Sequence, residues 1–180
     1  MAEVVARSKE PMVGAIKLVW WRESLEKLDR EPPPPEPRLQ AVAIELLPRG
    51  LGGADLAALE EPWALVLTEQ QQGNLMEAAA MRGSRLFKLA ARLLGVAMTG
   101  GLEGLAQSFA TADLGRRGIL PISAVTPQGT SVQVPRKARP LTMFAALASR
   151  DLRRRGPPFE PEGTPGRAWI LLRHRLTGRL

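Results

Sequence analysis

The segment from Met12 to Leu28 constrains the fold most, because apolar residues recur through it at helical spacing. At about 100° per residue, two nearly opposite helix faces are both apolar, one carrying Leu18, Trp21, Leu25 and Leu28 and the other carrying Met12, Ile16, Val19 and Trp20. A helix that is apolar on opposite faces is normally buried by neighbours on both sides. The sequence therefore predicts that this segment is the central helix of an all-α domain.

Proline and glycine divide the rest of the chain into further helices. Pro11 suits the first turn of the central helix, and Pro32 cannot continue it. Helical spacing predicts further helices over about 36–47, 55–67 with an interruption at Pro62, 74–94 ending before Gly95, 102–116, 140–154 and 167–176. Residues 119–135 are rich in proline and glycine and predict a long loop, in which residues 131–134 alternate as in a short strand. The expected fold is an all-α bundle of six or seven helices.

Length and composition favour a single domain spanning residues 1–180. A chain of 180 residues with 44% hydrophobic residues can bury a core of ordinary size. No apolar run approaches the roughly 20 residues that span a bilayer, and the N-terminus lacks the pattern of a signal peptide. The absence of cysteine excludes disulfides and thiolate metal sites, and the single histidine, His174, excludes a multi-histidine site. These features predict a cytoplasmic protein.

The positive charge of the chain is confined to its C-terminal quarter. Residues 136–180 contain eleven basic and three acidic residues, a net charge of +8, whereas residues 1–135 carry a net charge of −1. This asymmetry predicts an anionic partner for the quarter, either a protein or a membrane surface. Nucleic acid is less favoured, because the basic residues lack interleaved aromatic residues and a known binding motif.

Two charged residues fall on otherwise apolar helix stripes, Arg82 in the helix predicted over 74–94 and Asp113 in the next one. An unpaired buried charge is very costly, so the sequence predicts that Arg82 and Asp113 pair across a helix–helix contact. Two alternatives stay open at this stage: Arg82 extends to the surface, or both residues line a functional pocket. No phosphate-binding loop, nucleophile elbow or metalloprotease motif is present.

Several segments resemble the squalene/phytoene synthase family. Residues 17–25, KLVWWRESL, are similar to the family segment RLAWWREAL, and the proline-rich EPPPPEP follows as a turn does in that family. Residues 82–95 resemble the next long helix of the family, and residues 106–121 stand where its second aspartate-rich helix and following loop would lie. The resemblance covers about residues 11–155, leaves 156–180 as a basic C-terminal segment, and implies an isoprenoid-synthase-like bundle that is truncated at the N-terminus.

The departures from this family imply loss of catalysis. Family enzymes hold Mg²⁺ with two aspartate-rich segments, and the metal neutralises the substrate diphosphate. The first segment would precede the central helix, where about ten residues without aspartate remain, and in the second the expected DxxxD is DxxxR because Arg117 follows Asp113. The chain is similar to a shorter branch of the family that is poor in metal ligands and includes a mitochondrial complex I assembly factor.

The expected function is therefore that of a non-catalytic binding or assembly factor, without a cofactor, in the cytoplasm or peripheral at the inner membrane. The alternative is a prenyl-diphosphate transferase that needs Mg²⁺ and uses Arg82, Arg116 and Arg117 to hold the diphosphate. A homodimer is also open, because a missing N-terminal helix would leave one face of the central helix uncovered. No catalytic or metal-binding residue is assigned; the candidate pocket residues are Trp20, Trp21, Arg22, Arg82, Asp113, Arg116 and Arg117.

Overall fold

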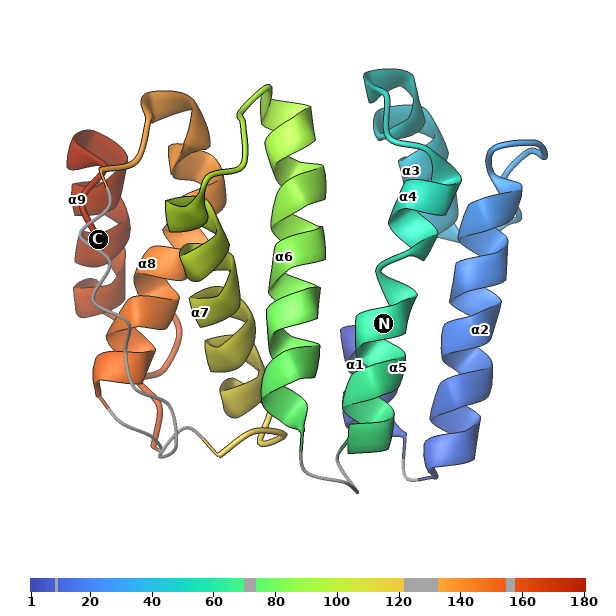
Figure 1. The fold of residues 1–180 in the computed structure, drawn as a ribbon, viewed down its shortest axis with the longest axis horizontal. Coiled ribbons are helices and arrows are strands. Elements are labelled where there is room, and N and C mark those ends of the chain that lie inside the picture. The colour runs from blue at the N-terminus through green and yellow to red at the C-terminus, as the bar shows by residue number, and fades with distance from the viewer. Residues whose placement is uncertain (9, 70–73, 122–132, 155–157) are drawn as a thin grey trace. The chain divides into compact units, whose positions relative to one another are not determined.

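The computed structural model describes residues 1–8, 10–69, 74–121, 133–154 and 158–180. Every regular element within these ranges is a helix, which confirms the all-α prediction (Figure 1). The described residues form nine α-helices and not six or seven, because residues 2–7 add a helix and the segment around Pro62 forms two. No described helix combines the length and apolar character needed to cross a membrane. The contacts divide the chain into two compact units, Met1–Ala78 and Ala79–Leu180, which we describe in turn. The single-domain assignment stays a prediction.

Unit 1 contains five α-helices and one short 3-10 helix in its described residues, and local signals set their ends. Pro11 occupies the first turn of α2, and Glu36 caps α3 by accepting a hydrogen bond from the backbone N–H of Leu39 at 2.8 Å. The interruption expected at Pro62 takes the form of a short helix followed by a second one. The bounds are Ala2–Arg7 for α1, Pro11–Lys27 for α2, Pro37–Glu45 for α3, Leu47–Arg49 for the 3-10 helix η1, Gly53–Ala57 for α4 and Glu60–Glu69 for α5.

Within unit 1, α2 is buried on one face only, and not on both faces as the sequence predicts. Leu18 and Leu25 of α2 and Leu28, directly after its end, are buried, and α2 packs against α4 and α5. On the other face, however, Met12 and Ile16 are 74% and 63% exposed. Periodicity identified both apolar faces, but unit 1 supplies neighbours for only one of them. Within unit 1, this helix is therefore an amphipathic partner of α4 and α5 and not a central helix.

A carboxylate at the end of α2 holds the start of α4. Asp29 accepts hydrogen bonds from the backbone N–H groups of Gly53 and Ala54, at 2.5 and 2.9 Å, and these bonds lower the pKa of the Asp29 carboxyl. The two helices approach so closely that a Cβ on Gly53 would overlap the carbonyl oxygen of Leu25. Glycine is therefore required at this contact.

Unit 2 contains α6 (Leu75–Leu94, which enters the unit at Ala79), α7 (Gly100–Arg116), the 3-10 helix η3 (Arg136–Ala138), α8 (Arg139–Arg153) and α9 (Pro165–Thr177). The ends of α6 and α7 agree with the sequence predictions to within two residues, and Gly95 adopts φ +61° directly after α6. Of the short strand expected over 131–134, residues 131 and 132 lie outside the described residues, and residues 133 and 134 are not in a strand. The core joins α6, α7 and α8 through Phe87, Ala91, Leu102, Leu105, Ala106, Val134, Ala138, Leu141 and Ala145.

His174 is fully buried in unit 2 and fixes α9 against α8. Its Nε2 lies 2.8 Å from Oγ1 of Thr142, and its Nδ1 lies 3.0 Å from the backbone carbonyl oxygen of Arg179. The neighbouring Arg139 donates hydrogen bonds through Nη1 to the carbonyl oxygens of Arg175 and Leu176, both at 2.9 Å. These bonds satisfy the C-terminal carbonyl groups of α9 and set which of its faces points inward.

Candidate functional site

The predicted Arg82–Asp113 pair is confirmed. Nη2 of Arg82, on α6, donates to Oδ2 of Asp113, on α7, at 2.6 Å, and the Arg82 residue is 7% exposed. Arg117, one turn after Asp113, donates through Nε to the same Oδ2 at 3.0 Å. The arginine in the DxxxR pattern is therefore a second cationic partner of Asp113.

The environment of Arg82 combines burial with two stabilising contacts. Burial lowers the pKa of the Arg82 guanidinium, and the negative charge of Asp113 opposes that shift. The Arg82 guanidinium also lies over the ring of Phe109, with its Cζ 5.6 Å from the ring centroid. An arginine side chain remains charged in proteins, so the pair places a cation and its counterion inside unit 2.

A second ion-pair cluster is centred on Asp151 of α8, which is 3% exposed. Arg116 of α7 donates to both carboxylate oxygens, from Nε at 2.6 Å and from Nη2 at 3.0 Å, and Arg167 of α9 donates through Nη1 at 2.8 Å. Nη2 of Arg116 also donates to the backbone carbonyl oxygen of Glu160 at 2.9 Å. The hydrogen bonds that Arg116 donates to the Asp151 carboxylate raise the pKa of Arg116. One buried carboxylate thereby joins α7, α8 and α9.

Glu160 forms a third cluster beside these two. Its carboxylate accepts hydrogen bonds from Arg150 and from the hydroxyl of Thr164, both at 2.6 Å, and Nη1 of Arg154 lies at 3.1 Å. The bond from Arg150, followed by that from Thr164, lowers the pKa of Glu160 to about 2.

This lowered pKa gives a measurable pH dependence. Because the ordinary pKa of glutamate is higher, the Glu160 carboxylate stabilises the fold fully above about pH 5 and loses that contribution as the pH falls towards about 2. We expect Glu160→Gln to be less stable than the wild type at neutral pH, with the difference shrinking on acidification. Urea unfolding across this pH range measures the difference in the free energy of unfolding between the variant and the wild type. Glu31→Gln, in the exposed turn after α2, is the control. A difference that is constant with pH would contradict the assignment.

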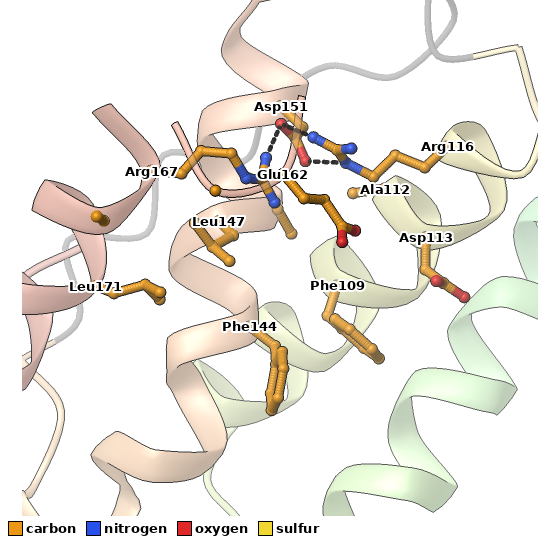
Figure 2. A pocket seen from close by; sticks show the side chains of 13 residues that line it. Phe109, Ala112, Asp113, Arg116, Phe144, Leu147, Asp151, Glu162, Arg167 and Leu171 are labelled. Carbon is orange, nitrogen blue, oxygen red and sulfur yellow. Dashed lines mark hydrogen bonds and ion pairs between the residues drawn. The ribbon is translucent and has the colours of Figure 1, made fainter. Parts of the chain in front are cut away.

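A cavity of about 400 Å³ lies between α7, α8 and α9. Figure 2 shows the Asp151 ion pairs at one end of it, with Phe109 and Phe144 towards the other end. Its wall is mostly apolar, and Asp113 and the exposed Glu162 also border it. The full lining is Phe109, Ala112, Asp113, Arg116, Phe144, Leu147, Ala148, Asp151, Glu162, Gly163, Arg167, Ala168 and Leu171.

The carboxylates of Asp113 and Asp151 are already engaged by arginines. Each of them pairs with two guanidinium groups, and of these four arginines only Arg116 and Arg167 line the cavity, together with the carboxylates of Asp113, Asp151 and Glu162. Carboxylates that are bonded to arginine at 2.6 Å are not available as ligands for Mg²⁺ without breaking those pairs. Among the described residues, no group of three or more side chains of the metal-binding types could hold a metal ion.

The seven predicted pocket residues divide between the two units. Asp113 and Arg116 line the cavity, and Arg82 and Arg117 adjoin it as partners of Asp113. The remaining three, Trp20, Trp21 and Arg22, belong to α2 of unit 1.

Within unit 1, the tryptophan pair does not form a core. Trp20 is 47% exposed, and the two indoles meet edge to face with their centroids 5.1 Å apart. The guanidinium of Arg38 lies 6.0 Å from the centroid of Trp21, and Nη1 of Arg22 lies 3.8 Å from the buried carboxylate of Glu60. The second apolar face of the helix, on which the sequence places Trp20, is therefore not part of the core of unit 1.

Sequence reasoning missed Asp151, Arg167 and Glu160 as members of the site. The signal for the first two was present, because Asp151 follows Ala148 on the inward stripe of α8, and Arg167 shares a helix face with Ile170 and His174. A charged residue on an otherwise apolar helix stripe identified Arg82 and Asp113, and the same criterion marks Asp151 and Arg167. Glu160 lies outside the helices, so no periodicity marks it.

Comparisons of the chain with protein-family models, with curated proteins and with solved structures find no match.

Proposed function

We propose that this chain is a non-catalytic binding protein whose α7–α8–α9 cavity takes an apolar molecule with an anionic group. The observation that carries the proposal is the commitment of Asp113 and Asp151 to pairs of guanidinium groups. In the same proposal, the chain is a degenerate relative of the squalene/phytoene synthases, with a shortened isoprenoid-synthase-like bundle, that acts as a binding or assembly factor.

The anionic group follows from the arginine donors at the polar end of the cavity. Arg116 and Arg167 both line this end, where each donates to Asp151 (Figure 2). Each guanidinium has five N–H donors, which is more than the bonds to Asp151 engage. Both side chains can therefore donate to a carboxylate or phosphate of the ligand as well.

The apolar part of the ligand follows from the rest of the wall. Phe109, Phe144, Leu147 and Leu171 line the cavity away from the ion pairs. A cavity of about 400 Å³ with a few polar groups at one end is typical of sites for small apolar ligands. The ligand class is therefore an amphipathic anion, such as an isoprenoid phosphate or a fatty acid.

The alternative of prenyl-diphosphate transfer is not favoured by this geometry. It requires Arg82, Arg116 and Arg117 to converge on one diphosphate, yet Arg82 and Arg117 donate to Asp113, and Arg116 donates to Asp151. Ionisation of a diphosphate also needs the leaving group to be neutralised by metal ions. Farnesyl diphosphate is therefore the probe that separates binding from turnover.

The experiment measures binding of farnesyl diphosphate and of dodecanoate by calorimetry, with and without Mg²⁺, together with release of pyrophosphate. We expect binding of at least one probe without Mg²⁺ and no release of pyrophosphate. Mg²⁺-dependent release would overturn the proposal in favour of the transferase. Failure of both probes to bind would overturn the cavity as a site for amphipathic anions.

A variant that fills the cavity locates the binding. Ala168 lines the cavity on α9 and is exposed, so Ala168→Trp can occupy the cavity without enlarging the core. We expect it to weaken binding of the probe about tenfold or more, because the indole takes the space of the apolar part. Ala41→Trp, at an exposed position of α3 in unit 1, is the matched control and leaves affinity unchanged. Equal affinities for the two variants would contradict this location.

A further inference from the structure

Helix α9 has one face that unit 2 buries and one that it leaves open. Arg167, Ile170 and His174 are buried at spacings of three and four residues. Trp169, Leu172 and Leu176 repeat the same spacings on the opposite side and are 61%, 48% and 68% exposed. We call these three residues the α9 stripe. Three large apolar side chains in line on one exposed helix face form a candidate binding surface.

The orientation of α9 is set by polar contacts on its buried face. His174 bonds to Thr142, Arg167 bonds to Asp151, and Arg139 donates to the carbonyl oxygens at the end of the helix. Rotating the helix to bury the α9 stripe would break all of these contacts and expose a paired charge. The stripe is therefore fixed on the outside of unit 2.

Basic residues flank the α9 stripe, and acidic residues are absent beside it in sequence. Residues 164–180 contain four arginines and no aspartate or glutamate. At the C-terminal end of α9, Leu176 shares a surface hollow with Arg136, Arg139 and Arg175. Arg136, Arg175 and Arg179 are exposed. An apolar stripe is thus bordered by several guanidinium groups.

We propose that α9 docks on an anionic lipid bilayer, lying in the plane of its surface. Trp169, Leu172 and Leu176 enter the boundary between headgroups and acyl chains, and the flanking arginines bind lipid phosphates. A tryptophan–leucine face bordered by arginine is the pattern of helices that lie in this interface. Indole is also enriched at the headgroup level of membranes, and phosphate matches the guanidinium fork.

The observations favour lipid over an acidic protein. The stripe lies on the outer side of a single 13-residue helix, and the arginines stand at its border and not at its centre. A protein partner would need a concave acidic surface of matching length, whereas a bilayer needs only a flat anionic one. Arginine stems can lie along the apolar surface while their charged ends reach the phosphates.

The test is flotation of the full chain with vesicles. Vesicles of phosphatidylcholine alone are compared with vesicles containing about 30 mol% phosphatidylglycerol, at low salt and at about 0.5 M NaCl. We expect the chain to float with the anionic vesicles only and to be largely released at high salt. Failure to float with anionic vesicles at low salt would overturn the proposal.

Matched triple variants identify the surface. Trp169→Ser, Leu172→Ser and Leu176→Ser together remove the α9 stripe, and we expect vesicle affinity to fall about tenfold or more. Far-UV circular dichroism and melting temperature check that this variant keeps its fold. The control removes the exposed α2 residues with Met12→Ser, Ile16→Ser and Trp20→Ser, and it keeps wild-type binding. Equal loss in the two variants, or no loss in the first, would overturn the proposal.

Two further measurements distinguish lipid docking on the α9 stripe from dimerisation through it and from lipid entry into the cavity. A wild-type dimer in light scattering that the α9 variant converts to a monomer would assign the stripe to a second copy of the chain and overturn lipid docking. Ala168→Trp, which fills the cavity, is expected to float as the wild type does. Loss of flotation in Ala168→Trp would instead mean that a lipid enters the cavity, and it would overturn docking through the stripe.

Discussion

Asp151→Asn is expected to destabilise the protein by about 3–5 kcal/mol, the range for removing one partner of a buried ion pair. Asp151 is 3% exposed and holds two guanidinium groups, of which Arg167 is itself 7% exposed. Asparagine keeps the size of the side chain but removes its charge, so Arg116 and Arg167 repel each other inside unit 2 without a counterion. Urea unfolding of the full chain, followed by far-UV circular dichroism, measures the change.

The control for Asp151→Asn is an ion pair at the surface. The carboxylate of Glu45, the last residue of α3, and the guanidinium of Arg49, the last residue of η1, are 2.8 Å apart, with side chains 60% and 64% exposed. Glu45→Gln is expected to cost no more than about 0.5 kcal/mol, because water screens an exposed pair. If Asp151→Asn lowered the free energy of unfolding as little as Glu45→Gln does, the ion-pair cluster that joins α7, α8 and α9 would not be a main source of stability in unit 2.

Gly83→Ala is expected to destabilise the protein by about 2 kcal/mol, although alanine is normally the better helix former by about 1 kcal/mol. Gly83 lies in α6 against α7, where an added Cβ would overlap the backbone oxygen of Ala106 and lie 2.6 Å from its carbonyl carbon. Backbone atoms cannot rotate away as a side chain does. The two helices must therefore separate, which opens the core that Phe87 and Ala106 share.

Gly100→Ala is the matched control for Gly83→Ala. Gly100 is also helical, at the start of α7, but its added Cβ has no neighbour within 4 Å. This variant is expected to be as stable as the wild type or slightly more stable, because the backbone entropy of glycine is removed without a clash. A Gly83→Ala protein that matched Gly100→Ala would contradict the close approach of α6 and α7. The same urea titration serves both variants.

The helices were predictable because their limits are local. Pro11, Pro62 and Gly95 act through their own backbone geometry, which does not depend on distant residues. The Arg82–Asp113 pair was predictable for a related reason. A charge on an apolar stripe must find a partner, and one opposite charge on the next helix was available.

The rest of the site was not predictable from single helices. The Asp151 cluster draws one residue from each of α7, α8 and α9, and its two hydrogen-bonded pairs join residues that are 35 and 16 positions apart in sequence. The hydrogen bond between Gly53 and Asp29 likewise depends on the close packing of α2 against α4, which neither segment determines by itself. Which arginine reaches which carboxylate depends on helix rotation and contact distance, and both of these are tertiary quantities.

The sequence by itself determined the all-α class, the ends of most helices and the concentration of positive charge in the last quarter, because these depend on spacing, composition and local backbone chemistry. Only the tertiary structure decided which apolar faces are covered. The same periodicity marks both faces of α2 and both faces of α9, but packing buries Leu18 and Ile170 and leaves Ile16 and Leu172 outside. The physical reason is that periodicity shows only that removing a face from water would be favourable. Whether that face is buried depends on whether the fold places another element against it.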